Sequence, residues 1–260
     1  MKLLAIDSSG LVATVALLSD DSMIAEFTIN YRKTHSQTLL PMIDDMVKTA
    51  GFDLKSLDAI ATAAGPGSFT GLRIGSATAK GLAFSLNIPI IPVPTVDALA
   101  WNLCGSRGLV CPLMDARRSQ VYTGLYRFEE DGSFTVCAPQ RVVSIAELAD
   151  LVNAAGGDAP ATGGGAPATD GSTSAVNGGA SVSGDCIPVT FLGDGVPPYR
   201  SQLDTLIHVP FRIAPPHLAR QRAGAVGALG MKLYAEGKAQ SAAEHVPYYL
   251  RMAQADEEKK

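Results

Sequence analysis

The stretch from Gly65 to Gly75, which reads GPGSFTGLRIG, is the feature that most constrains the fold of this chain. It follows an apolar run at 57–64 that is typical of a buried strand, and it opens a helical pattern that extends to about Leu86. Glycines and a proline at such a junction require a sharp bend and a close approach of the backbone to another group. The free N–H groups of the following helix favour an anion. A turn that only connects the two elements is the alternative, and the density of glycines argues against it.

The same stretch does not match either of two common phosphate-binding motifs. The pattern G-x-G-x-x-G fails because Thr70 occupies the position of the third glycine. The Walker pattern fails because no Gly-Lys-Ser/Thr sequence closes the loop. The loop therefore predicts backbone contact rather than a lysine-based phosphate site.

Small residues recur every four positions in the helix that follows, at Gly71, Gly75, Ala79 and Ala83. Residues four apart share one helix face, so this face is nearly flat. A flat face allows a second helix to approach closely, and this contact offsets the cost of glycine, about 1 kcal/mol per residue relative to alanine. Close packing against the sheet of the same lobe explains the pattern equally well.

Composition narrows the class of protein. The chain has 260 residues, of which 47% are hydrophobic, and this suits an α/β protein. Its net charge of −4 argues against autonomous binding to nucleic acid. Its four cysteines have no C-x-x-C spacing and are interpreted as reduced thiols. Because the sequence shows no signal peptide and no apolar stretch of about 20 residues, we expect a cytoplasmic protein that does not enter the membrane.

The expected elements occur in the same order twice. Each copy has three strands, a helix, a strand, a glycine-containing turn and another helix. In the first copy these elements are expected at 2–6, 12–18, 23–30, 34–50, 57–64 and 69–86. In the second copy they are expected at 109–114, 120–128, 135–143, from 144, at 188–192 and at 216–237. The duplication predicts an α/β fold with two similar lobes that face each other across a cleft.

We expect an N-terminal lobe at 1–104 and a C-terminal lobe at 105–252. The second lobe is interrupted at 155–185 by a tract of mostly Gly, Ala, Ser, Thr, Asp and Pro without aromatic residues. Such a tract cannot bury enough apolar surface to offset its ordering entropy, about 1–2 kcal/mol per residue, so we expect a flexible surface insertion. Residues 253–260 are expected to form a charged tail.

Several segments together carry a resemblance. They are Leu4–Ser9, His35–Gln37, Gly65–Gly75, Met114–Arg118, Gly193–Gly195 and Pro247–Arg251. A duplicated unit with an aspartate after its first strand resembles the actin–sugar kinase–heat-shock ATPase superfold, whose lobes are mixed sheets flanked by helices. Within that superfold, the segments are similar to the TsaB (YeaZ) family of glycoprotease-like proteins.

The resemblance implies a non-catalytic subunit that binds and activates a TsaD-like catalytic partner. With a TsaE-like ATPase, these proteins form threonylcarbamoyladenosine on the tRNA adenosine beside the anticodon. The tRNA would meet this chain only through the complex. Without its partner, the chain would pair with itself as a homodimer. The expected interface combines the first helix with the small-faced helix and contains Leu39, Leu40, Ile43, Met46, Gly71, Gly75, Ala79 and Ala83.

The histidines argue against a catalytic metal. The catalytic relative has a metal-binding H-x-x-x-H on its first helix, whereas here Leu39 stands four residues after His35. One histidine cannot hold a metal ion alone, and the other histidines lack ligand spacing. We therefore expect no catalytic residue and no metal site, and a metallopeptidase is the less favoured alternative.

A nucleotide in this superfold is held by turns whose N–H groups cradle phosphate. The residues available for such a contact are Asp7, Ser8, Gly67, Ser68, Arg117 and Arg118. Bulky Arg117 and Arg118 stand where the second turn needs close backbone approach, and both arginines could simply face water. We expect no tightly bound cofactor, with ATP or ADP at a heterodimer junction. An independent ATPase or small-molecule kinase remains the alternative function.

Overall fold

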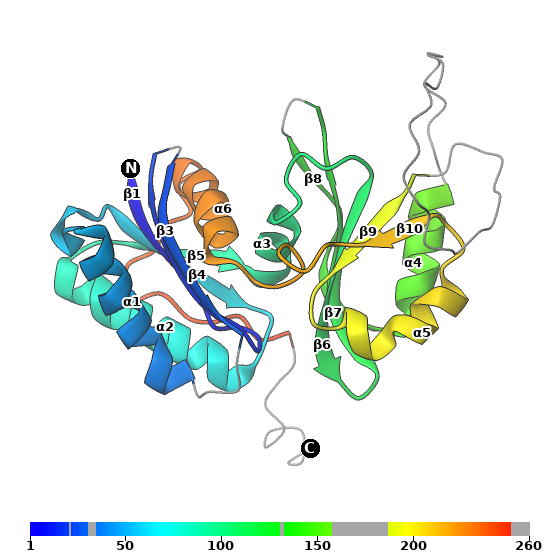
Figure 1. The fold of residues 1–260 in the computed structure, drawn as a ribbon, viewed down its shortest axis with the longest axis horizontal. Helices are drawn as coiled ribbons and strands as arrows, with labels where there is room; N and C mark the ends of the chain where they lie inside the picture. The colour runs from blue at the N-terminus through cyan, green and yellow to red at the C-terminus, as the bar shows by residue number, and fades with distance from the viewer. Residues whose placement is uncertain (21, 31–34, 131–132, 158–186, 251–260) are drawn as a thin grey trace.

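The two expected lobes are present and each is built around one five-stranded sheet (Figure 1). The computed structural model describes residues 1–20, 22–30, 35–130, 133–157 and 187–250. The predicted insertion at 155–185 falls largely outside these residues, as does the predicted tail at 253–260. The sheets have matching orders, β3-β2-β1-β4-β5 and β8-β7-β6-β9-β10, so the predicted duplication is confirmed.

The first sheet combines antiparallel and parallel pairs, since β1 pairs antiparallel with β2 and parallel with β4. Its strands are β1 (Lys2–Asp7), β2 (Ala13–Ser19), β3 (Ser22–Ile29), β4 (Ala59–Gly65) and β5 (Ile90–Pro94). Every residue of β4 is buried, as expected for a strand covered on both faces. Helices α1 (His35–Ala50) and α2 (Phe69–Leu86) cover one face, and a 3₁₀ turn (Leu54–Ser56) lies between α1 and β4.

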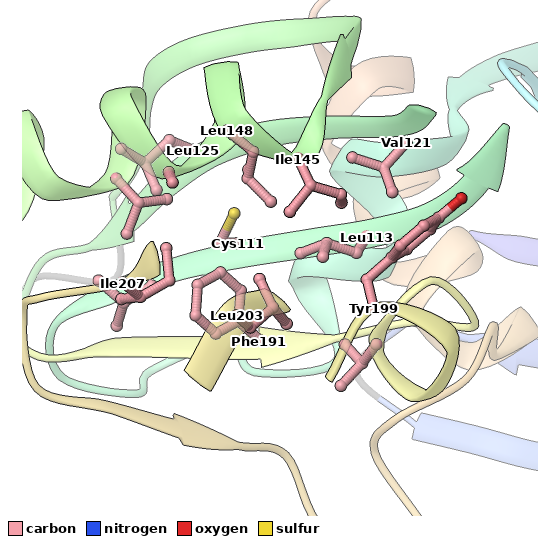
Figure 2. Close-up of a cluster of buried hydrophobic side chains, with 14 of the residues drawn as sticks. Cys111, Leu113, Val121, Leu125, Ile145, Leu148, Phe191, Tyr199, Leu203 and Ile207 are labelled. Atoms are coloured by element: carbon pink, nitrogen blue, oxygen red, sulfur yellow. The ribbon is translucent and has the colours of Figure 1, made fainter. Parts of the chain in front are cut away.

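The second sheet repeats this arrangement around β6. Its strands are β6 (Leu109–Arg117), β7 (Gln120–Phe128), β8 (Phe134–Ser144), β9 (Val189–Leu192) and β10 (Phe211–Ile213). Helices α4 (Ile145–Gly157) and α5 (Val196–Leu206) pack on one face of it. Figure 2 shows how Leu113 of β6, Leu148 of α4 and Leu203 of α5 converge in this core. The hydroxyl of Ser144 and the carboxylate of Glu147 cap α4 reciprocally, as the sequence predicts.

The prediction for the end of the chain was wrong in three respects. The glycine turn after β9 leads into α5, which the sequence analysis did not identify, because two prolines at its start obscure the helical pattern. The last helix, α6 (Ala223–Ala235), begins seven residues later than predicted. Although α6 falls in the range assigned to the second lobe, it packs against the free face of the first sheet. Gly230 permits this contact, since a Cβ there would lie 2.8 Å from that of Ala61.

A short helix, α3 (Thr95–Trp101), joins the lobes. Its apolar residues share one buried cluster with strands of the second sheet, including Met114 and Tyr126. Trp101 meets Phe128 edge-on, with ring centroids 5.9 Å apart. The junction between the two lobes is therefore a hydrophobic core of its own.

Candidate functional site: the cleft between the lobes

A cleft of about 1090 Å³ opens between the two sheets at the carboxyl ends of β1 and β6. The first lobe contributes the turn after β1, His35 and the start of α2. The second lobe contributes the end of β6, the turn after β9 and the segment before α6. The lining residues used below are Ser9, Gly10, His35, Gly67, Ser68, Asp115, Arg117, Asp194 and Arg220. The cleft thus lies where sheets of this type place ligands.

Asp7 ends β1 behind the wall of the cleft and is only 2% exposed. Its Oδ1 accepts the N–H of Ser9 at 2.8 Å. Burial raises the pKa of Asp7 to about 6, although the hydrogen bonds from Ser9 and the nearby His35 act to lower it. His35 itself contacts the carbonyl of Gly10 through Nε2 at 2.9 Å. On this side of the cleft, Asp7 and His35 are therefore both bonded to the backbone of the turn after β1.

The turn after β1 lies directly against the start of α2. Ser8 Oγ donates to the carbonyl of Gly71 at 2.9 Å, and the N–H of Ser68 donates to the carbonyl of Ser9 at 2.7 Å. A Cβ on Gly71 would collide with the Ser8 carbonyl, and one on Gly75 would lie 2.6 Å from Ser8 Oγ. Gly71 and Gly75 are therefore required because the turn after β1 packs directly against this helix.

On the second-lobe side of the cleft, the polar groups of the turn after β6 bond to one another and to Asp194. Asp115 Oδ1 accepts the N–H of Arg117 at 2.8 Å, and Asp115 Oδ2 lies 3.1 Å from the guanidinium of Arg117. Asp194 Oδ1 accepts the N–H of Asp115 at 3.1 Å, and burial raises the pKa of Asp194. Arg220 lies near Asp194 and also lines the cleft.

The backbone of this turn is unusual. Arg117, Arg118 and Ser119 have φ values of 65°, 53° and 57°, in the left-handed region that favours glycine. None of these three residues is glycine, and two of them carry the bulky side chain of arginine. A phosphate cradle needs small residues whose N–H groups can converge, so this turn does not fit a nucleotide phosphate.

The predicted contact residues separate into three groups. Gly67, Ser68 and Arg117 line the cleft. Asp7 and Ser8 are each 2% exposed and lie behind its wall. Arg118 is exposed and lies outside the lining. The sequence thus located the two ends of the cleft but could not tell the surface residues from those that support them.

Seven of the eight predicted interface residues lie inside the first lobe, so the prediction that they form a surface was wrong. Only one of the eight, Leu40, is exposed, at 55%. The buried seven are Leu39, Ile43, Met46, Gly71, Gly75, Ala79 and Ala83. The alternative stated for the small face, packing within the same lobe, is the one observed. Apolar spacing identifies a buried face but does not say whether the cover is the same chain or another.

Within the described residues, no group of three or more His, Cys, Asp or Glu side chains could hold a metal ion. Four residues after His35, Leu39 is 1% exposed and belongs to the core under α1. In the same part of the chain, no helix is long and apolar enough to cross a membrane.

The two matching sheets and the cleft between their strand ends define the class of protein: a duplicated α/β protein of the actin–sugar kinase–heat-shock ATPase superfold. A family model described as TsaD, tRNA N6-adenosine threonylcarbamoyltransferase, matches residues 22–259, so the chain belongs to this family.

Several curated proteins that are similar to this chain are named TsaB. The tRNA threonylcarbamoyladenosine biosynthesis protein TsaB of Bacillus subtilis (strain 168) is 40% identical over 152 residues, which are 58% of this chain and 66% of that protein. TsaB of Escherichia coli (strain K12) is 38% identical over 135 residues, 51% of this chain and 58% of that protein. The matched segments thus span less than two thirds of either relative. The solved structure of YeaZ from Pseudomonas aeruginosa is 26% identical with a TM-score of 0.71 and covers 95% of this chain and 99% of its own. The resemblance to TsaB is confirmed.

Proposed function

We propose that this chain is a non-catalytic subunit that binds a TsaD-like partner in the formation of threonylcarbamoyladenosine on tRNA. The curated relatives are named for that biosynthesis, and the family model that matches this chain describes the transferase itself. A partner of the same family shares the architecture of this chain, so like helices can meet like helices. The surface that carries the proposal is the outward face of α1 and α2.

The observation that carries the proposal is Gly81, in the middle of α2. It is exposed, and none of the described residues lies within 4 Å of the position that its Cβ would occupy. Glycine costs a helix about 1 kcal/mol relative to alanine, and no contact among the described residues explains the loss. A second helix that approaches α2 closely at this point would explain it.

Gly81 lies at the centre of an outward stripe that the sequence analysis missed. Residues at positions 70, 74, 77, 81 and 84 share one face of α2. The side chain of Ala77 is small and projects little from this face. Phe84 lies at its C-terminal end, with a side chain that is 84% exposed. Figure 1 shows α1 beside α2, and α1 adds the exposed Leu40. Small residues flanked by exposed apolar ones are typical of a helix-packing surface.

The pairing of polar side chains with one another in the cleft is compatible with an accessory role. Arg117 is paired with Asp115 instead of being aimed at a substrate, and the turn it occupies does not fit a phosphate cradle. The cleft is therefore not expected to hold a tightly bound nucleotide. ATP or ADP would contact this chain at the junction with the partner, beside Gly67 and Ser68 at the start of α2. The TsaE-like ATPase and the tRNA would join through the complex.

The first test is a bulky substitution at the centre of the stripe. Gly81→Trp leaves the core of the lobe untouched and removes a helix glycine, so the variant is expected to unfold at a denaturant midpoint no lower than that of the unmodified chain. It prevents close helix contact, and binding to a TsaD-like partner should weaken by about 10- to 100-fold, the equivalent of 1–3 kcal/mol of overpacking. Calorimetry with the purified partner measures the affinity, and sedimentation of the isolated chain measures the homodimer expected in its absence.

Two matched variants complete the design. Ala228→Trp places the same side chain on the exposed face of α6 and should bind the partner normally. Gly81→Ala should stabilise the chain by about 1 kcal/mol, because alanine is the better helix former. Unchanged affinity of Gly81→Trp would remove α2 from the interface.

A further inference from the structure

Residues 237–250, which follow α6, form no regular helix and cross back over the first lobe as a strap. Gln240 exchanges two backbone hydrogen bonds of 2.8 Å with Ile90 at the edge of the first sheet. Farther along, the N–H of Tyr248 donates to the carbonyl of Ala64 at 2.6 Å. The ring of Tyr249 then lies on that of Phe69, the first residue of α2, with centroids 5.0 Å apart. The strap is thus held at its ends and runs along α2 between them.

The middle of the strap buries a histidine. His245 is 1% exposed, and neither of its ring nitrogens has a hydrogen-bond partner among the described residues. A neutral imidazole carries one donor and one acceptor, and leaving both unpaired in the interior is costly. The ring is nevertheless held there, because the strap on either side of it is anchored to the lobe.

Charge around this ring is of one sign. Lys80 of α2 donates from Nζ to the carbonyl of His245 at 2.9 Å and to that of Ala243 at 3.4 Å. Burial lowers the pKa of His245, and the Lys80 ammonium lowers it further. The neighbouring carboxylate, Glu244, is turned to the hydroxyl of Ser241, 2.8 Å away. Within the described residues, no acceptor stands ready for an imidazolium at this position.

We propose that residues 237–250 form a proton-sensitive latch on α2, which opens when His245 takes up a proton. An imidazolium is strongly unfavourable in a buried site near an ammonium group, whereas water solvates the same charge once the ring is exposed. The strap can expose the ring by leaving the lobe, because it belongs to no helix and, among the described residues, its backbone is joined to the sheet at two places, the bridge at Gln240 and the Tyr248–Ala64 hydrogen bond. The latch is thus closed at neutral pH and opens in acid.

Opening acts on the helix that carries the proposed interface. It removes Tyr249 from Phe69 and frees Lys80, so the start and the middle of α2 lose their lateral support. This consequence rests on the proposed function, since it matters only if α2 binds the partner. The latch itself does not, and it can be measured on the isolated chain.

Hydrogen exchange tests the latch directly. The amide of Tyr248 is protected only while the strap is closed, so its exchange, corrected for the intrinsic rate, reports the opening equilibrium. Burial and the Lys80 ammonium lower the pKa of His245 while the strap is closed, so protonation favours the open strap, and opening should be more favourable at pH 5.5 than at pH 7.5 by up to about tenfold. Equal opening constants at the two pH values would overturn the proposal.

Variants separate the ring from the rest of the chain. His245→Leu keeps an apolar side chain in the site without a titrating group, so its opening constant should be the same at both pH values. His208→Leu removes an exposed histidine from the second lobe and should retain the tenfold change. A tenfold change that persists in His245→Leu would contradict the latch. Should that variant fail to fold, NMR of the unmodified protein decides, because a ring that titrates near pH 6.5 under a protected strap also contradicts it.

Binding of the TsaD-like partner at the two pH values provides an independent test. Its affinity should fall between pH 7.5 and 5.5 more for the unmodified chain than for His245→Leu. If the opening constant changes as expected but the affinities do not, the latch stands and the proposed role of α2 fails. If the partner binds and the strap does not open, the interface stands and the latch fails.

Discussion

At the scale of single residues, Asp7 shows how an aspartate at the end of a strand can serve the fold itself. An aspartate after the first strand suits a metal or a nucleotide when it faces the cleft. Here the carboxylate is buried, accepts the N–H of Ser9 and lies behind the lining. Its pKa of about 6 follows from that burial, so the ionised form costs stability at neutral pH.

Asp7→Asn should therefore change how stability depends on pH. Because the pKa of Asp7 rises from 3.8 in the unfolded chain to about 6 in the fold, its stabilising contribution is complete below pH 3.8 and is lost as the pH rises through 6. The difference is on the order of 3 kcal/mol. In urea unfolding at pH 4.5 and 7.5, the variant should gain relative to the unmodified chain at the higher pH. Asp45→Asn, on the exposed face of α1, is the control, and an equal effect of Asp7→Asn at both pH values would contradict the assignment.

At the scale of elements, α2 carries two narrow faces with opposite purposes. One face receives the turn after β1 through Gly71 and Gly75, and the other presents Gly81 to the outside. The sequence predicted the helix and its small residues correctly. It could not assign the faces, because a missing side chain looks the same whether the neighbour is the Ser8 carbonyl or another protein. The same limit explains why α1 was predicted to expose residues that form the core.

Gly71→Ala and Gly81→Ala should consequently have opposite effects. At position 71 the added Cβ meets the backbone of Ser8, which cannot move without displacing the end of β1, so a loss of about 1–3 kcal/mol is expected. At position 81 the same methyl group meets nothing. Urea unfolding of the two variants measures the difference. Equal stabilities would mean that the turn after β1 is not in contact with α2.

The second lobe shows which elements a pattern can predict. Strands β6, β7 and β8 alternate or are apolar throughout, and they were predicted within three residues of their ends. The start of α5 and the three residues of β10 carry too few periodic positions to be recognised, and their place depends on the sheet that they complete. The strap was missed for the same reason, since its order comes from Lys80 and Ile90, which are distant in sequence.

At the scale of the whole molecule, the two lobes are joined by a shared core. The hydroxyl of Tyr126, on β7, donates to Asp97 of α3 at 2.6 Å, and burial raises the pKa of Asp97. The crossing segment before α6 is held by Asn102, whose Nδ2 donates to the carbonyl of Arg220 at 2.6 Å. A packed junction of this kind should keep the cleft fixed at one width.

The chain has a single tryptophan, Trp101, which lies in this junction and reports on it. If the lobes share a core, Trp101 fluorescence and far-ultraviolet circular dichroism should give coincident urea transitions, because neither lobe can unfold while the other keeps the junction intact. Phe128→Ala removes a ring that meets Trp101 edge-on and is 5% exposed, so both transitions should move together to lower urea, by about 3–5 kcal/mol in free energy of unfolding. Leu40→Ala, on the outer face of α1, should leave them in place. A fluorescence transition that precedes the loss of circular dichroism would show that the lobes separate before they unfold, and the fixed cleft would then have to be replaced by a hinged one.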